Sequence, residues 1–151
     1  MDTRKHIALA VLGAAACLVM ATAGAQQALP KSECPQPRFT GPAPGEYLGR
    51  QNPVPPNADL AEARKLFLGD GDRVSCAKCH GEKGDGRGPM SAMFDPHPRN
   101  FACAETVNGI PDGQLFWIIR FGSPNTSMPP HPKLTDEQIW KLVAYLRQLA
   151  R

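Results

Sequence analysis

The feature that most constrains this chain is the pentapeptide CAKCH at residues 76–80, in which a histidine directly follows the second of two cysteines. A closed structural zinc site needs four cysteine or histidine ligands, and no second Cys-x-x-Cys pair follows to complete one. A thioredoxin-like dithiol uses the same spacing in a βαβ setting, but no segment alternates convincingly between polar and apolar residues as a strand would. Zinc, a redox dithiol and a plain disulfide are therefore the weaker interpretations of the pentapeptide.

The stronger interpretation is a covalently attached haem. Cys-x-x-Cys-His is the attachment signature of c-type haem, in which two thiols add to the porphyrin vinyl groups and the histidine supplies one axial bond to iron. This spacing places both sulfur atoms along one edge of the ring and carries the imidazole beneath its centre. The sequence therefore predicts one haem c held by Cys76, Cys79 and His80.

Haem iron also needs a sixth ligand or an open position. Met90 and Met93 follow the attachment site too closely for a chain that must first pass around the ring edge, so we expect them to pack against the porphyrin. Met128 lies in the stretch NTSMPP, where two prolines stiffen the backbone. Met128 is the predicted sixth ligand, and His97, His131 and an open site remain alternatives.

The first 25 residues have the pattern of a secretory signal. Arg4 and Lys5 precede an apolar run over residues 7–23, and the small residues Ala23-Gly24-Ala25 follow it. A retained membrane anchor is the alternative, because the run approaches the roughly 20 apolar residues that span a bilayer. We expect a signal peptide at 1–25, a Pro-rich arm at 26–57 and a folded domain at 58–151, with export to the periplasm.

The charge of the mature chain gives no support for binding nucleic acid. Removal of the signal leaves 15 basic residues (17 minus 2) and 13 acidic residues (14 minus 1). This near balance also argues against a strong membrane interaction once the signal is cleaved.

Four cysteines remain after the signal is removed, and two of them are assigned to the haem. Exported proteins meet an oxidising compartment, where unpaired cysteines tend to form disulfides. We therefore predict a disulfide between Cys34 and Cys103, with free or intermolecular thiols as the alternative.

Helical periodicity accounts for most of the apolar residues of the domain. Thr135 and Gln138 have the spacing of a capping box, and one short turn is expected near residues 91–94. The prolines of the arm predict an extended segment that lies against the domain. Helices are predicted from a possible N-cap at Asn57 to the glycine at 69, over residues 112–121, and from Thr135 to Leu149.

Together these patterns resemble class I c-type cytochromes. The motif CAKCH lies near the start of the domain, SMPP follows about fifty residues later, and KLVAYLR forms part of the last helix. Within that family, HGEKGDGRGP and PHPRNF are similar to bacterial monohaem domains such as the one in subunit III of cbb3 oxidases. The resemblance covers roughly residues 59–151. It implies a small all-α fold in which the first and last helices cross around the covalent haem, with Ala63 and Phe67 against Leu142 and Tyr145.

The resemblance also implies roles for residues outside the haem motif. Pro89 matches the family proline whose carbonyl accepts a hydrogen bond from the ring of His80, and Arg99 resembles a partner of a haem propionate. A solvated loop charge is the alternative for Arg99. Trp117 and Trp140 are interpreted as core residues, with a place in the wall of the haem pocket left open.

These features predict an electron-transfer protein. An iron with six ligands has no vacancy for a substrate, so its chemistry is one-electron exchange. We expect an exported carrier, or the electron-accepting subunit of a redox enzyme, that is not itself an enzyme and whose partner is a dehydrogenase, an oxidase or another cytochrome. The alternative is a haem enzyme or gas sensor in which the sixth position is open or displaceable.

Overall fold

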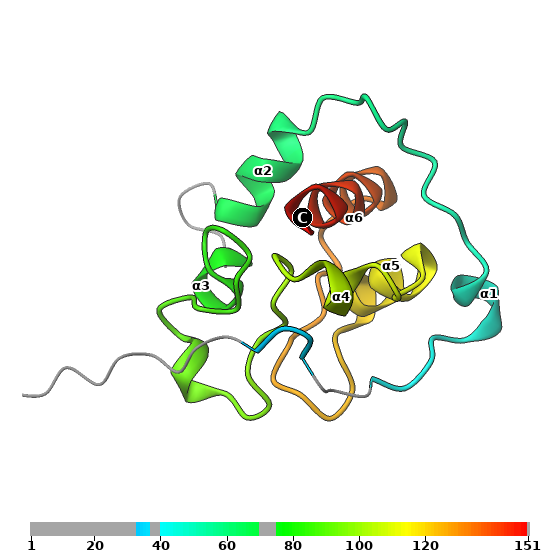
Figure 1. The fold of residues 1–151 in the computed structure, drawn as a ribbon. Coiled ribbons are helices and arrows are strands. Elements are labelled where there is room, and N and C mark those ends of the chain that lie inside the picture. The colour runs from blue at the N-terminus through cyan, green and yellow to red at the C-terminus, as the bar shows by residue number, and fades with distance from the viewer. Residues whose placement is uncertain (1–32, 37–39, 70–74, 151) are drawn as a thin grey trace, which may run out of the picture.

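The structure, a computed structural model, describes residues 33–36, 40–69 and 75–150 (Figure 1). No strand occurs within these ranges, so the all-α prediction is confirmed. The predicted signal at 1–25 lies outside the described residues. The elements in chain order are α1 (Gly45–Leu48), α2 (Ala61–Leu68), α3 (Ala77–His80), the 3-10 turn η1 (Ser91–Met93), α4 (Ala104–Val107), α5 (Asp112–Phe121) and α6 (Asp136–Leu149).

Helix α6 forms where a capping box and an apolar stripe agree. The Thr135 side chain accepts a hydrogen bond from the Gln138 backbone, and the Gln138 side chain accepts one from the Thr135 backbone. These reciprocal bonds satisfy two backbone donors that a helix start leaves without partners. The buried face carries Ile139, Leu142, Val143 and Leu146, as the sequence predicts.

Helix α2 packs on α6, as the resemblance implies (Figure 1). Ala63 is fully buried between them, and the rings of Phe67 and Tyr145 lie 5.5 Å apart edge to face. The predicted N-cap at Asn57 is wrong, since α2 begins at Ala61. The Asp59 carboxylate accepts from the Ala61 backbone at 2.9 Å and so satisfies the first donor of the helix instead.

Helix α5 has the predicted bounds and ends at Gly122, whose φ of 85° is a conformation that favours glycine. It packs against α6 through Phe116 and Trp140, whose ring centroids are 4.4 Å apart. The guanidinium of Arg147 on α6 pairs with Asp112 at 2.7 Å, which fixes the start of α5 to the end of α6.

The described part of the Pro-rich arm is packed against the domain, as predicted, but it is not wholly extended. Pro44 starts the short helix α1, which lies against α5 (Figure 1). A Cβ atom on Gly113 would lie 1.8 Å from the Tyr47 carbonyl oxygen, so only glycine permits this close approach. The side chain of Gln114 bonds the arm on both sides, accepting from the Ala43 backbone and donating to the Gly41 carbonyl at 3.0 Å.

Candidate cofactor site

A cavity of about 650 Å³ lies between α3, α5, the arm and the loop after α5. This volume is in the range of ligand pockets, about 300–1,000 Å³. Much of its wall is apolar and comes from Phe67, Phe101, Leu115, Ile119 and Leu142. The predicted site residues that line it are Cys76, Cys79, His80, Arg99 and Met128.

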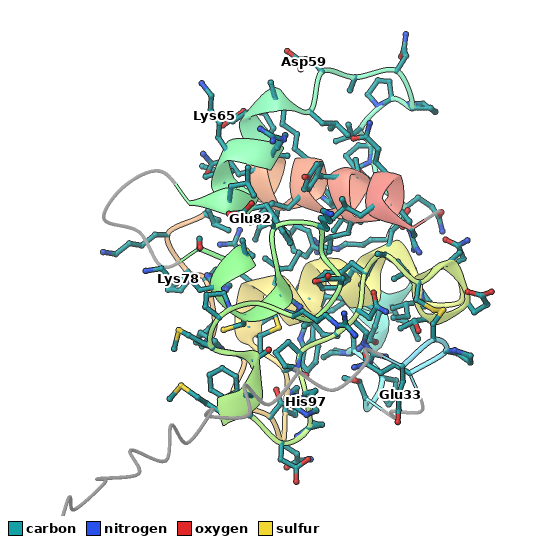
Figure 2. The ribbon with its side chains drawn as sticks, turned by 60° about the vertical axis from the view of Figure 1, so that its left-hand side comes forward. Glu33, Asp59, Lys65, Lys78, Glu82 and His97 are labelled. Atoms are coloured by element: carbon teal, nitrogen blue, oxygen red, sulfur yellow. A yellow bond between two sulfur atoms is a disulfide. The ribbon has the colours of Figure 1, made fainter. Side chains whose placement is uncertain are left out.

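The short helix α3 supplies the two thiols and the imidazole. The backbone amides of Cys79 and His80 both donate to the Cys76 carbonyl, at 3.1 and 2.8 Å, which winds the motif into one tight turn. Ala77 between the cysteines is buried, whereas Lys78 is exposed and points away from the domain (Figure 2). Gly81 then ends the turn at a φ of 79°. The turn therefore directs Cys76, Cys79 and His80 to the same cavity.

Both thiols of the motif are unpaired and half-buried. Burial raises the pKa of the Cys76 thiol to about 11 and also raises the pKa of Cys79. Both shifts have the same main cause, because burial in the cavity wall disfavours the charged thiolate.

The ring of His80 is held by a backbone carbonyl. Its Nδ1 atom lies 2.9 Å from the carbonyl oxygen of Arg99, and its ring centroid lies 4.5 Å from that of Phe101. A neutral imidazole that donates from Nδ1 keeps its lone pair on Nε2, the form that ligates a metal. The hydrogen bond thus prepares His80 to serve as a ligand.

The acceptor of this bond corrects the role predicted for Pro89. The backbone amides of Gly88 and Met90 donate to the Cys79 and Lys78 carbonyls, at 3.1 and 2.9 Å, and so hold the chain around residue 89 against the end of α3. Pro89 is exposed there and does not line the cavity. The carbonyl that accepts from His80 therefore belongs to Arg99.

The loop after α5 places Met128 in the cavity wall. The Ser123 amide donates to the Met128 carbonyl at 3.2 Å, and the Met128 amide donates to the Thr126 hydroxyl at 3.2 Å. A Cβ atom on Gly122 would lie 2.8 Å from the same Met128 carbonyl, so a side chain there would force the loop apart. These contacts fix the backbone on both sides of the thioether.

The other candidate ligands divide between the cavity and the surface. His131 lines the cavity, and burial lowers its pKa. His97 does not line it, and its Nδ1 atom lies 3.1 Å from the Ser91 carbonyl oxygen. Met90 and Met93 do not line it either, and Met93 is 73% exposed, so their predicted packing against the cofactor is wrong.

Trp140 belongs to the core, whereas Trp117 is only half-buried. Trp140 is buried against Phe116, and Trp117 lies 6.2 Å from Phe121 between ring centroids. Neither lines the cavity. The interpretation as a core residue therefore holds for Trp140 but not for Trp117, and neither side chain forms part of the pocket wall.

Arg99 and Ser123 are among the polar side chains of the cavity wall. Arg99 donates to the Thr40 hydroxyl at 3.3 Å, so the arm helps to place its guanidinium. Ser123 is buried, and its hydroxyl has no hydrogen-bond partner within the described residues. A buried hydroxyl without a partner costs free energy unless a bound group satisfies it. Sequence analysis missed Ser123, because no local pattern distinguishes it from an ordinary turn serine.

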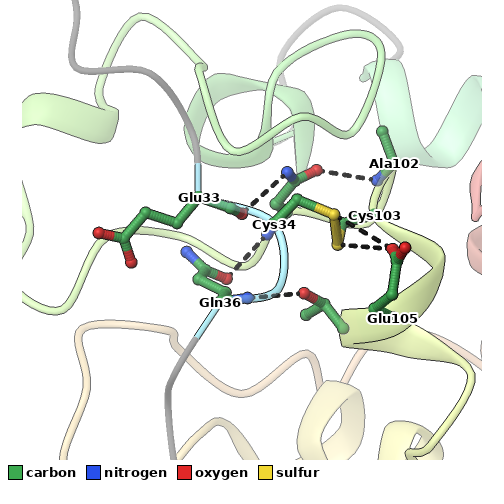
Figure 3. The surroundings of a disulfide bond; sticks show 8 residues. Glu33, Cys34, Gln36, Ala102, Cys103 and Glu105 are labelled. Atoms are coloured by element: carbon green, nitrogen blue, oxygen red, sulfur yellow. Dashed lines mark hydrogen bonds between the residues drawn. A yellow bond between two sulfur atoms is a disulfide. The ribbon is translucent and has the colours of Figure 1, made fainter.

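A disulfide joins Cys34 of the arm to Cys103 at the start of α4, with 1.99 Å between the sulfur atoms (Figure 3). This is the pairing that the cysteine count predicts. The Glu105 carboxylate lies 3.2 and 3.4 Å from the two sulfur atoms. The bridge does not line the cavity, but the next two arm residues, Pro35 and Gln36, do.

Comparison with known proteins agrees with a haem site formed by Cys76, Cys79, His80 and Met128. A family profile described as cytochrome c matches residues 60–150, which is more than half of the chain. The chain belongs to the cytochrome c family. No curated protein matches it.

One similar solved structure comes from the reducing HAO-like protein complex of Kuenenia stuttgartiensis. Its chain is 24% identical, with a TM-score of 0.55, over 69% of this chain and 49% of that one. The present chain thus spans about half the length of that neighbour, and the likeness is one of fold.

Membership of the cytochrome c family implies a covalently bound haem c with its iron. The residues present fit this cofactor, because two thiols, an imidazole oriented through its Nδ1 atom and a buried hydroxyl without a partner in the described residues line a cavity of suitable size. Within the described part of the chain, no helix has the length and apolar character needed to cross a bilayer. The narrower similarity to cbb3 subunit III stays a prediction.

Proposed function

We propose that this protein is an exported monohaem c-type cytochrome that transfers single electrons with His80 and Met128 as the axial ligands of its iron. The observation that carries the proposal is that Cys76, Cys79, His80 and Met128 all line one cavity, although the methionine lies about fifty residues after the motif. Two separately fixed segments, the α3 turn and the loop after α5, thus supply both kinds of ligand to a single space.

The bound haem supplies an iron that accepts and releases one electron. The residues of the chain determine how readily it does so. Cys76 and Cys79 would hold the ring, His80 is oriented by the Arg99 carbonyl, and Met128 would fill the iron position that a substrate would otherwise need. A histidine with a methionine raises the reduction potential relative to harder ligand pairs.

Two of the polar residues of the cavity suit the carboxylates at the edge of a haem ring. In this proposal Arg99 and Ser123 bind the haem propionates, the first by charge and the second by its unsatisfied hydroxyl. The apolar side chains around them exclude water, which limits the rearrangement that accompanies a change of charge.

The partner is a redox protein, namely a dehydrogenase, an oxidase or another cytochrome. The mature charge of +2 (15 minus 13) is nearly cancelled by two propionates, so strong electrostatic steering is not expected. Small and transient interfaces are typical of such encounters. The packed arm favours a subunit of a redox enzyme over a free carrier, because a carrier has no evident need of it.

Optical spectra of the holoprotein test the axial ligands. We expect a low-spin c-type spectrum and a weak band from sulfur ligation that disappears in Met128→Ala. Met93→Ala is the matched control, because its side chain is exposed and should leave the band unchanged. A band that survives Met128→Ala would refute the ligand assignment.

Ligand binding and purification separate the competing functions. A high-spin ferric form that binds cyanide or carbon monoxide in the unmodified protein would favour a haem enzyme or gas sensor. Stable co-purification with a dehydrogenase or oxidase would identify a subunit, and isolation as a single chain with rapid electron exchange would identify a carrier.

A further inference from the structure

The side chain of Gln36, in the arm, bonds the segment that faces His80. We propose that Gln36 is a positioning residue for the haem iron, because it fixes the backbone carbonyl of Arg99 that orients the ring of His80. The inference rests on the proposed role of His80 as an axial ligand.

The side-chain amide of Gln36 bonds the backbone on both sides of Arg99. Its Nε2 atom donates to the Pro98 carbonyl at 3.1 Å, and its Oε1 atom accepts from the Asn100 amide at 3.1 Å. One primary amide thus satisfies a donor and an acceptor that flank Arg99, as a neighbouring strand would. The Arg99 carbonyl between these two bonds is the one that lies 2.9 Å from Nδ1 of His80.

Gln36 is itself held in place by three links to the domain. Its backbone amide donates to the Thr106 hydroxyl at 2.9 Å. Two residues earlier, Cys34 is bonded to Cys103, and the carbonyl of Glu33 accepts from the Asn100 side chain at 3.3 Å (Figure 3). The arm therefore carries a fixed hydrogen-bonding group to the segment that faces His80.

The position of this carbonyl bears on the iron through the imidazole. A hydrogen bond from the free ring nitrogen of a ligand histidine fixes the orientation of the ring and raises its basicity. A more basic imidazole stabilises the ferric state more than the ferrous state. Loosening the carbonyl should therefore raise the reduction potential and expose the ring N–H to solvent.

The variant Gln36→Met tests the positioning role in the holoprotein. Methionine keeps a side chain of similar length and removes both side-chain hydrogen bonds of Gln36. We expect its reduction potential to rise, so that the ferrous form exceeds the ferric form at the midpoint potential of the unmodified protein. We also expect faster hydrogen exchange at the ring N–H of His80, measured by NMR of the ferrous form. The exchange rate is a readout that a change of cavity polarity alone would not move.

Asn52→Leu is the matched control. Asn52 also ties the arm to the domain, by donating to the Trp140 carbonyl at 3.0 Å, but it does not line the cavity. It should lower stability and leave both the potential and the exchange rate unchanged.

A second variant keeps the test decisive if Gln36→Met does not fold. Replacement of both Cys34 and Cys103 by serine releases the anchor of Gln36 without altering a cavity-lining residue, and should move both readouts in the same direction by less. Unchanged readouts, or a shifted potential with an unchanged exchange rate, would overturn the inference. If the unmodified protein shows the low-spin spectrum, these negative results overturn the role of Gln36 and leave the proposed function intact. If the unmodified protein lacks that spectrum, both the role of Gln36 and the proposed function are overturned.

Discussion

Helix α6 and the N-terminal arm both pack on α5, but they are held there by different forces. Helix α6 buries a continuous apolar face, including Ile139 and Val143, which are fully buried. In the described part of the arm only Ala43 is buried, and the half-buried ring of Tyr47 packs on Phe116. Directional bonds involving Gln114 and Asn52 and the disulfide at Cys34 tie the arm to the domain. Burial stabilises without specifying direction, whereas hydrogen bonds fix the position of each peptide group. The arm is thus suited to placing atoms around the cavity, and α6 to stabilising the domain.

The largest loss of stability should come from the apolar face of α6. Ile139→Ala removes a fully buried side chain that does not line the cavity and should lower the free energy of unfolding by about 2–5 kcal/mol. Urea unfolding of the holoprotein measures this. Glu137→Ala, an exposed change on the same helix, should alter it by less than about 1 kcal/mol. Similar losses in both variants would contradict the claim that the buried apolar face of α6 stabilises the domain.

Opening the disulfide should come next. Cys34 and Cys103 are 69 residues apart in the sequence, and their replacement by serine should lower the free energy of unfolding by about 2–4 kcal/mol. The same urea experiment measures the loss. A double variant as stable as the unmodified protein would show that the bridge does not hold the arm to the domain.

Loss of one polar contact of the arm should cost less. Gln114→Ala leaves the buried amide of Ala43 without its acceptor, for an expected loss of about 1–3 kcal/mol. Gln51→Ala, at an exposed position of the arm, should stay within about 0.5 kcal/mol of the unmodified protein. Equal effects in the two variants would contradict the view that hydrogen bonds hold the arm.

The smallest effect should come from the cap of α6. Thr135→Ala removes the side-chain acceptor of the capping box and should lower stability by about 1 kcal/mol. Thr135→Ser keeps the hydroxyl and should restore most of it, as measured by the midpoint of thermal unfolding. A loss as large as that of Ile139→Ala would mean that polar contacts dominate in α6 as well.

The sequence predicts best the features whose signals are local. Helix α5 ends where Gly122 predicts, and α6 starts at the capping box of Thr135, because each boundary depends on neighbouring residues. The pentapeptide at 76–80 likewise predicts haem attachment from the spacing of its own cysteines and histidine. In each case a few adjacent positions determine the structure.

The features that sequence analysis missed depend on contacts between distant segments. Helix α1 forms within a proline-rich stretch that is packed on α5, and Gln36 meets Pro98 across 62 positions. The resemblance predicts that the Pro89 carbonyl orients His80, whereas the fold supplies the carbonyl of Arg99. No local sequence pattern predicts which backbone carbonyl accepts a hydrogen bond from the His80 ring in the folded chain.

The most direct test of the account is peptide mapping of the purified protein by mass spectrometry without reduction. The account predicts haem on the peptide that contains Cys76 and Cys79, and a disulfide between the peptides of Cys34 and Cys103. Free thiols at 76 and 79, a disulfide between them, or a bridge from either to the arm would contradict it.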